Sequence, residues 1–513
     1  MLQTLTRFFQ KHRNLTAWAL GSLAVQALPP FYHWYLLFVS FSGLLGLLFS
    51  ADNHKQAFKL GWWYGFGFFS FGLFWINNAL LINPEQTAWL IPIVFLASGA
   101  FFGLFIGLPT LLASLVRSRF GRYLSLCSWI VVFEWIRSWI LTGFPWNLWG
   151  SCLAFSDELL QSAAIFGTYG LSFALIAVTA APALLLADHR RATVLSAVAI
   201  LILVPSLMWG FGHWRLSRLA SPQGDITIRL VQPSIPQGQK WSPELSQQHF
   251  EQYINLTRSQ PLNNIDMVVW SETASPYSLD SDPEAMRQLQ PIINPQGYLT
   301  TGVIRYQTDY YGGYKPLNSS LVINADGIIE ASYDKSHLVP FGEYIPLREY
   351  LPTFIRPIAN TIGTFLSGNG PQTLKVPNLP PFGIQICYEI IFPHQIIDSD
   401  SKPEWLLNLT NDGWYGISAG PYQHLVSTRL RAVEEGLTIV RSAGSGISAV
   451  IDRTGRVISS LDLNQSAILD VTLPRDLQIS TVFNRFGGLL TLTLCFINIL
   501  IAMLFNCRKR III

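Results

Sequence analysis

Long apolar segments fill the first 211 residues of the chain, and one more lies near the C-terminus. A bilayer core about 30 Å thick is crossed by roughly 20 apolar residues in a helix that rises about 1.5 Å per residue. We therefore predict eight membrane-spanning helices. They cover residues 15–28, 31–50, 57–81, 89–116, 124–141, 160–187, 194–211 and 486–505. Pro29 and Pro30 separate the first two, which we interpret as two spans joined by a tight turn rather than one kinked span.

The basic residues of the short loops fall on one side of this predicted topology. They are Arg7, Lys11, Arg13, Lys55, Lys59, Arg117, Arg119, Arg122, Arg190, Arg191, Arg508, Lys509 and Arg510. The loops on the other side, around residue 30 and at 83–87 and 142–159, contain no Lys or Arg. Cytoplasmic loops of membrane proteins carry an excess of these residues. We therefore predict that both termini are cytoplasmic and that the segment 217–484 lies outside the cytoplasm.

That polar segment shows a second kind of pattern. Short β-branched and apolar runs predict strands at 226–231, 267–270, 299–304, 321–323, 383–387, 405–408, 437–440 and 447–451. Helical patterns intervene at 243–258, 283–289 and 423–435. Alternating strands and helices predict an α/β layered domain. The predicted organisation is a seven-span bundle (1–216), this domain (217–484), and an eighth span with a basic tail (485–513).

Composition narrows the classes of protein that remain. Of the 513 residues, 50% are hydrophobic and 13% are charged, whereas an average soluble protein carries about 25% charged residues. A wholly soluble chain and a disordered chain are therefore excluded. A net charge of +3 is too small to indicate nucleic acid as a partner. Five cysteines without a Cys-x-x-Cys pair exclude a disulfide scaffold and a zinc ribbon. Scattered histidines and the lack of nucleotide-binding fingerprints predict no metal and no cofactor.

Three ionisable residues of the polar domain are candidates for chemistry. Cys387 is the domain's one cysteine and lies at the end of an apolar strand, where a side chain can leave the sheet and meet a ligand. Glu272 ends another strand and could remove the thiol proton, and the ammonium of Lys335 could favour the thiolate and stabilise an oxyanion. A buried core cysteine and two exposed loop charges are the alternative interpretation. Sequence separation alone does not show that the three residues meet.

Four longer motifs resemble one known family. They are WSETASP at 270–276, KSHLVPFGEY at 335–344, ICYE at 386–389 and NLTNDGWYG at 408–416. In this order they resemble the apolipoprotein N-acyltransferases, a membrane-bound branch of the nitrilase superfamily with a Glu-Lys-Cys triad. The resemblance covers essentially the whole chain, because that family also places its nitrilase-like domain between the last two of eight spans.

The resemblance implies an αββα sandwich on a bundle of membrane helices, in a bacterial inner membrane, with a periplasmic catalytic domain. Cys387 would attack an acyl ester of a phospholipid, typically phosphatidylethanolamine, and form an acyl thioester. The α-amine of the diacylglyceryl cysteine of an apolipoprotein would then accept the chain. Glu272 is implied as the general base and Lys335 as the oxyanion stabiliser.

Further residues match positions of the same family. Glu343 is implied to support the triad electrostatically, and Tyr388 and Glu389 are implied to shape the pocket of the nucleophile. Trp241 and Asn318 match positions linked to substrate binding and site organisation. The apolar segment 344–366 lacks a clear period, which favours either a membrane-dipping loop or an ordinary loop with a small hydrophobic cluster.

Two other functions stay open from the residues. A membrane-tethered amidase of the same superfamily would use water in place of the amine acceptor, but a small soluble substrate needs no membrane bundle. A transporter or a non-catalytic assembly factor would require the triad to be accidental.

Overall fold

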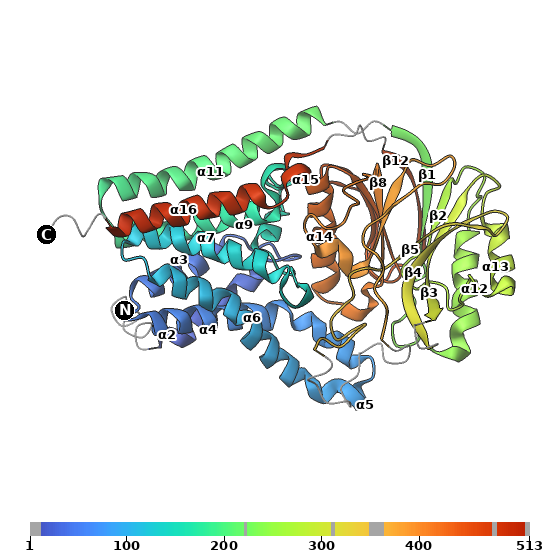
Figure 1. The fold of residues 1–513 in the computed structure, drawn as a ribbon, viewed down its shortest axis with the longest axis horizontal. Coiled ribbons are helices and arrows are strands. Elements are labelled where there is room, and N and C mark those ends of the chain that lie inside the picture. The colour runs from blue at the N-terminus through green and yellow to red at the C-terminus, as the bar shows by residue number, and fades with distance from the viewer. Residues whose placement is uncertain (1–11, 220–222, 309–312, 348–363, 475–479, 508–513) are drawn as a thin grey trace. The chain divides into compact units, whose positions relative to one another are not determined.

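The computed structural model describes residues 12–219, 223–308, 313–347, 364–474 and 480–507 (Figure 1). The chain forms two compact units. The first, which we call the helical unit, comprises Met1–Asn77, Glu85–Arg218 and Thr481–Ile513. The second, which we call the sheet unit, comprises Asn78–Pro84 and Leu219–Ser480.

A helix lies in each of the eight segments that we predicted as spans. The principal helices of this unit are α2 (Arg13–Ala24), α3 (Leu36–Phe49), α4 (His54–Gly72), α6 (Ile91–Ser114), α7 (Arg119–Arg137), α8 (Asp157–Leu160), α9 (Ala163–Ala180), α10 (Pro182–Ala187), α11 (Arg191–Arg218), α15 (Val482–Phe486) and α16 (Leu489–Cys507), and the short α5 (Pro84–Thr87) precedes α6. Small residues let helices approach closely: a Cβ on Gly65 of α4 would lie 2.8 Å from Cα of Gly103 in α6.

Length and hydropathy support membrane association for part of this unit. Among the described residues, three helical segments are long and apolar enough to cross a bilayer: Pro84–Ser114, Ala163–Ala187 and Arg191–Arg218. Leu36–Phe49 and Leu489–Phe505 are apolar but shorter. The helix α2 has only 12 residues, about 18 Å at the usual rise, and α7 contains three arginines and a glutamate. Eight membrane crossings therefore stay a prediction.

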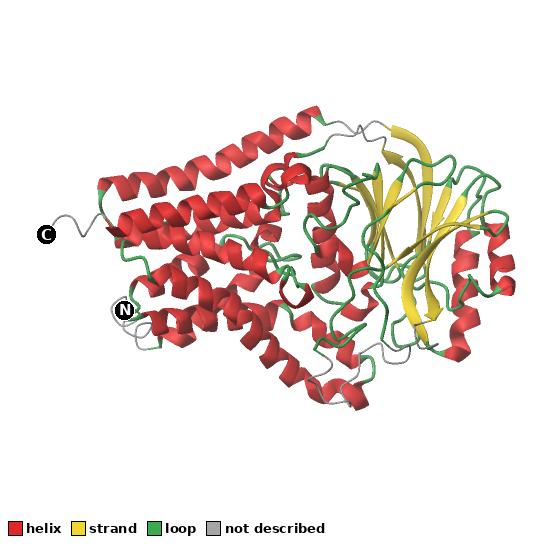
Figure 2. Cartoon of the chain, viewed as in Figure 1, coloured by secondary structure: helices red, strands yellow, loops and turns green. Residues whose placement is uncertain are grey.

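Within the described residues, the sheet unit contains two six-stranded sheets (Figure 2). One sheet has the order β12-β1-β2-β3-β4-β5, and the other has the order β11-β10-β9-β8-β7-β6. The strands are β1 (Gln223–Gln232), β2 (Met267–Val269), β3 (Tyr298–Thr308), β4 (Tyr314–Asn324), β5 (Ile329–Asp334), β6 (Thr373–Leu374), β7 (Phe382–Ile386), β8 (Trp405–Thr410), β9 (Thr438–Ala443), β10 (Ser448–Ile451), β11 (Val457–Leu461) and β12 (Ala467–Pro474).

The two sheets pack face to face, with helices on their outer faces. One core cluster joins apolar side chains of both sheets, among them Ile228, Val269, Ile384 and Leu407. A second cluster packs α12 (Ser246–Thr257) and α13 (Pro283–Leu289) against the first sheet, while α14 (Gly420–Glu435) covers the second (Figure 1). This αββα arrangement agrees with the predicted layered fold. All eight predicted strands and all three predicted helices overlap observed elements.

Parallel pairing brings several strand ends to one edge of the sandwich. β7, β8 and β9 run parallel, as do β1, β2 and β3. Every residue of β7, β8 and β9 is buried, because the second sheet is covered on both faces. Carboxyl ends of parallel strands are where side chains can meet a ligand. Cys387 follows β7 directly, and the turn that carries Glu272 follows β2.

Candidate active site

The three predicted catalytic residues each follow a strand, and each is buried. Glu272 lies in the turn after β2, Lys335 directly after β5, and Cys387 directly after β7; their exposed fractions are 6%, 1% and 5%. The turn of Glu272 packs closely on β3, where a Cβ on Gly302 would lie 2.7 Å from Cα of Glu272. Glycine at this position therefore lets the backbone of the Glu272 turn approach β3 closely. The backbone of Cys387 is left-handed, with φ 52°.

An ion-pair cluster joins the predicted base, the predicted oxyanion stabiliser and the predicted supporting glutamate. Lys335 Nζ lies 2.9 Å from Glu343 Oε1 and 3.6 Å from Glu272 Oε1. Asn318 of β4 bridges the carboxylates, because its Nδ2 donates to Glu272 Oε1 at 2.8 Å and to Glu343 Oε1 at 3.0 Å. The backbone N–H of Val339 donates to Glu343 Oε2 at 2.8 Å. The ammonium of Lys335 thus lies between the carboxylates of Glu272 and Glu343, and these hydrogen bonds hold both carboxylates in position.

Burial and these charges determine the protonation of the site. Burial and the nearby Glu272 carboxylate raise the pKa of Cys387 to about 12, against the opposing effect of Lys335. Burial alone would lower the pKa of Lys335, but Glu343 and Glu272 outweigh it and raise that pKa above its ordinary value. The resting site therefore holds a neutral thiol and an ammonium. Glu272 Oε2 has no hydrogen-bond partner among the described residues, so this atom is available to take a proton.

Glu389 holds the segment that follows Lys335 against the strand that precedes Cys387. Its Oε1 accepts from Tyr333 Oη, from the backbone N–H and hydroxyl of Ser336, and from the N–H of His337, at 2.8 to 3.1 Å. Its Oε2 accepts from the N–H of Ile386 at 2.7 Å. Glu389 is 2% exposed, and burial raises its pKa. Glu389 thus connects the two segments that carry the thiol and the ammonium.

The remaining predicted residues lie around this cluster. Tyr388 is buried, and its ring centroid lies 5.8 Å from that of His337 and 5.1 Å from that of Phe392. Trp241 is half-buried, and Lys240 Nζ lies 5.9 Å from the centroid of its ring. Most of the predicted loop 344–366 lies outside the described residues, since 348–363 are not described.

Sequence reasoning missed two groups that contact the site. Lys240 Nζ donates to the backbone oxygen of Glu272 at 3.0 Å, and burial lowers the pKa of Lys240 to about 8 despite the attraction of Glu272 and Cys387. The sequence feature that could have pointed to Lys240 is its position directly before Trp241, which matches a position of the family linked to substrate binding. Tyr415 Oη lies 3.9 Å from Cys387 Sγ. Tyr415 belongs to the motif at 408–416, where only the resemblance pointed to a role.

A metal centre is not evident in the part of the chain that the structure describes. No group of three or more His, Cys, Asp or Glu side chains in these ranges is placed to hold a metal ion. The arrangement suits covalent catalysis by a thiol, with a carboxylate that takes its proton and an ammonium beside the reacting carbonyl.

Comparison with known proteins covers both units. Residues 20–181 match the apolipoprotein N-acyltransferase N-terminal domain, and residues 227–481 match the carbon-nitrogen hydrolase domain. The chain is 36% identical to the apolipoprotein N-acyltransferase of Rhodopseudomonas palustris, over 97% of this chain and 95% of that protein. It is 39% identical to the one from Allorhizobium ampelinum, over 90% and 89%.

Among solved structures, a variant of the amidase from Nesterenkonia sp. AN1 is 16% identical, with a TM-score of 0.35 over 49% of this chain and 94% of that chain. Near full-length identity above 30% to named relatives, with both domains matched in order, establishes the family. The chain belongs to the apolipoprotein N-acyltransferases.

Proposed function

We propose that this acyltransferase moves an acyl chain from a phospholipid to the α-amine of the diacylglyceryl cysteine of an apolipoprotein, through a thioester on Cys387. The observation that carries the proposal is a buried group made of the neutral Cys387 thiol, the ammonium of Lys335 and a Glu272 carboxylate oxygen that has no partner in the part of the chain that the structure describes. The relatives are named apolipoprotein N-acyltransferases, and this name gives the class of reaction. The assignment of these residues to its steps is our proposal.

In the first step, Glu272 Oε2 takes the proton of the Cys387 thiol as the sulfur attacks the ester carbonyl carbon. The carbonyl oxygen becomes an oxyanion, which Lys335 Nζ stabilises. Collapse of the tetrahedral intermediate breaks the carbon–oxygen bond of the ester. The departing alkoxide takes the proton from Glu272 and leaves as a lysophospholipid, while the acyl group stays on Cys387 as a thioester.

In the second step, the neutral α-amine attacks the thioester carbonyl and Glu272 removes a proton from the nitrogen. A second oxyanion forms at the same place, so Lys335 stabilises it in the same way. Breaking the carbon–sulfur bond then releases the amide, and the proton held by Glu272 returns to the sulfur. The thioester keeps enough acyl-transfer potential for this step to proceed without ATP.

Lipid substrates account for the long apolar helices of the chain. Exposing an acyl chain to water costs about 0.8 kcal/mol for each CH₂ group, so a membrane-associated enzyme can receive such a chain at far lower cost. The relatives are bacterial acyltransferases, and three helices among the described residues are long and apolar enough to cross a bilayer. We propose a location in the inner membrane with both termini in the cytoplasm and the sheet unit in the periplasm, on the basis of the loop charges. Phosphatidylethanolamine is the proposed donor.

Trapping the acyl-enzyme tests the proposal. The full-length protein in detergent is incubated with phosphatidylethanolamine that carries a labelled acyl chain, and peptides containing Cys387 are examined by mass spectrometry. We expect an acyl adduct on Cys387 that hydroxylamine removes and that transfers to a diacylglyceryl peptide. The variant Cys387→Ala should form no adduct. An adduct that transfers only to water would support the amidase alternative, and no adduct on the wild-type protein would refute the proposal.

A further inference from the structure

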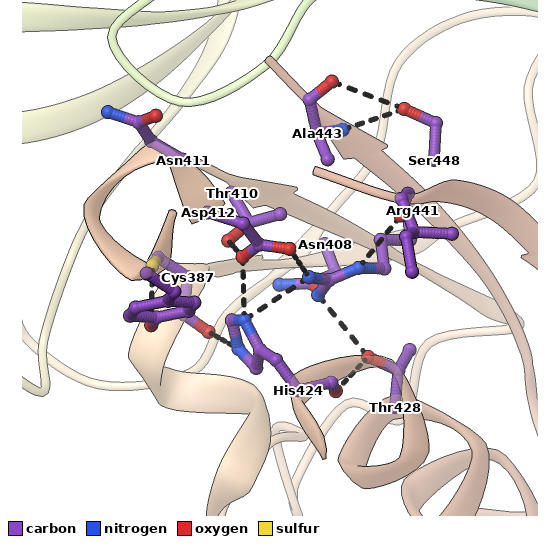
Figure 3. Close-up of polar contacts among 12 residues, drawn as sticks. Cys387, Asn408, Thr410, Asn411, Asp412, His424, Thr428, Arg441, Ala443 and Ser448 are labelled. Carbon is purple, nitrogen blue, oxygen red and sulfur yellow. Dashed lines mark hydrogen bonds and ion pairs between the residues drawn. The ribbon is translucent and has the colours of Figure 1, made fainter. Parts of the chain in front are cut away.

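A buried polar network lies behind the nucleophile, and the proposed steps do not use it (Figure 3). Asp412 follows β8, His424 lies in α14, and Arg441 lies in β9. His424 Nδ1 is 2.9 Å from Asp412 Oδ1, and Arg441 Nη2 donates to Asp412 Oδ2 at 2.6 Å. These three side chains are at most 1% exposed. Burying two charged groups so completely is costly unless they are paired and hydrogen-bonded, as they are in this network.

The network reaches the backbone of Cys387 through His424. Its Nε2 lies 3.1 Å from the carbonyl oxygen of Cys387. A carbonyl oxygen can only accept, so His424 donates an Nε2–H in this contact. On the other side of the ring, Nδ1 lies 3.2 Å from Arg441 Nη2, from which it accepts when the ring is neutral, and 2.9 Å from Asp412 Oδ1, to which it donates when the ring is protonated. The ring orientation is therefore determined at both nitrogens.

The carbonyl that accepts this hydrogen bond belongs to a residue with unusual backbone geometry. Cys387 has φ 52°, in the left-handed region that residues with a Cβ rarely adopt. Such a conformation persists when surrounding contacts hold it, and it is frequent at catalytic sites. The direction of the Cβ–Sγ bond depends on this backbone conformation, because the cysteine lies at the turn from β7 into the short helix Cys387–Ile391.

We infer that His424 is a positioning residue for acyl transfer: held by Asp412 and Arg441, it fixes the Cys387 carbonyl and keeps the backbone conformation that directs the sulfur toward Glu272 and Lys335. The inference rests on the proposed role of Cys387 and adds three residues that act through it. Their effect falls on formation of the thioester rather than on lipid binding. It is therefore an effect on kcat, with KM little changed.

Two substitutions of similar size separate hydrogen bonding from packing. Gln at position 424 can donate to the Cys387 carbonyl, whereas Met fills a comparable volume and cannot donate. We expect His424→Met to lower kcat for the phospholipid by about ten- to a hundredfold, equivalent to about 1.4–2.7 kcal/mol at 1.36 kcal/mol per tenfold. His424→Gln should recover at least half of that loss on a logarithmic scale. KM should stay within about twofold in both variants.

Val433→Ala is the matched control for stability, because Val433 is fully buried in the same helix. It should lower the melting temperature and leave kcat of the folded protein within about twofold.

Alkylation of Cys387 by iodoacetamide, followed by mass spectrometry, reports the position of the sulfur without any lipid. The rate of alkylation should change in His424→Met but not in Val433→Ala. Equal kcat in the wild-type, Met and Gln proteins, or equal losses in Met and Gln, would overturn the inference. In either case, an acyl adduct on Cys387 of the wild-type enzyme would still support the proposed function.

Discussion

Replacing Glu272 by Gln tests the proposed general base with little change of geometry. The substituted side chain keeps an oxygen that can accept from Asn318 Nδ2, a hydrogen bond of 2.8 Å in the wild-type protein. The atom that changes its chemistry is Oε2, which has no partner within the described ranges. General-base catalysis contributes about 10²- to 10⁴-fold. We therefore expect kcat to fall by that factor, which is about 2.7–5.4 kcal/mol of barrier.

Alkylation of the Cys387 thiol should not fall with kcat in Glu272→Gln, and its rate should stay equal or rise. The Glu272 carboxylate is one of the causes that raise the pKa of Cys387, so Glu272→Gln should lower that pKa and increase the thiolate fraction at a given pH. We expect iodoacetamide to alkylate Cys387 at an equal or higher rate at pH 8, while single-turnover acylation by phospholipid collapses. Glu330→Gln, an exposed carboxylate of β5, is the control and should change neither rate. Retained acylation, or parallel loss of both reactions, would refute the assignment of Glu272 as base.

Three further outcomes follow from the structure. Lys335→Ala should lower kcat by about 10²- to 10³-fold, the usual effect of losing one oxyanion donor at about 2.7–4 kcal/mol, and near-normal turnover would exclude the role assigned to Lys335. Burial lowers the pKa of Lys240 to about 8, so its charge is present below that pH and is lost above it. The ratio of wild-type to Lys240→Met activity should therefore exceed one at pH 7 and approach one above pH 9, and a ratio that stays constant with pH would contradict this effect. Leu407→Ala opens a cavity between the sheets and should cost about 2–5 kcal/mol of unfolding free energy, measured by denaturant titration, with the exposed control Ile328→Ala costing far less.

The buried strands inside the two sheets could be predicted from the sequence, whereas the strands at the sheet edges could not. β7, β8 and β9 are buried on both faces and appear as continuous apolar runs. β11 is mostly exposed and β12 mostly half-exposed, so neither produced a recognisable run. The spans are predicted from apolar length, with Pro29 and Pro30 separating the first two, and the charged residues of α7 show that apolar length by itself does not establish a crossing.

The residues of the candidate site likewise include some that could be predicted from the sequence and some that could not. Glu272, Lys335 and Cys387 could be singled out because each lies in a distinctive motif, and Glu272 and Cys387 also lie at the ends of expected strands. The contact of Lys240 with the Glu272 backbone spans 32 positions, and that of His424 with the Cys387 carbonyl spans 37. Neither separation has a periodicity that a single sequence reveals, because parallel strands and their connections decide which distant residues meet. Local patterns therefore identify the reacting groups but not the groups that support them.

The five hydrogen bonds of Glu389 have a consequence for how this enzyme can diversify. They join Tyr333, Ser336 and His337, on either side of Lys335, to Ile386, which lies 49 to 53 positions later in the chain. The spacing of the sulfur and the ammonium consequently does not depend on the length of the chain between these anchors, provided that Val339 and Glu343 of the ion-pair cluster and the strand β7 are kept. The reaction therefore places little constraint on the length of the remaining connection between the two anchors.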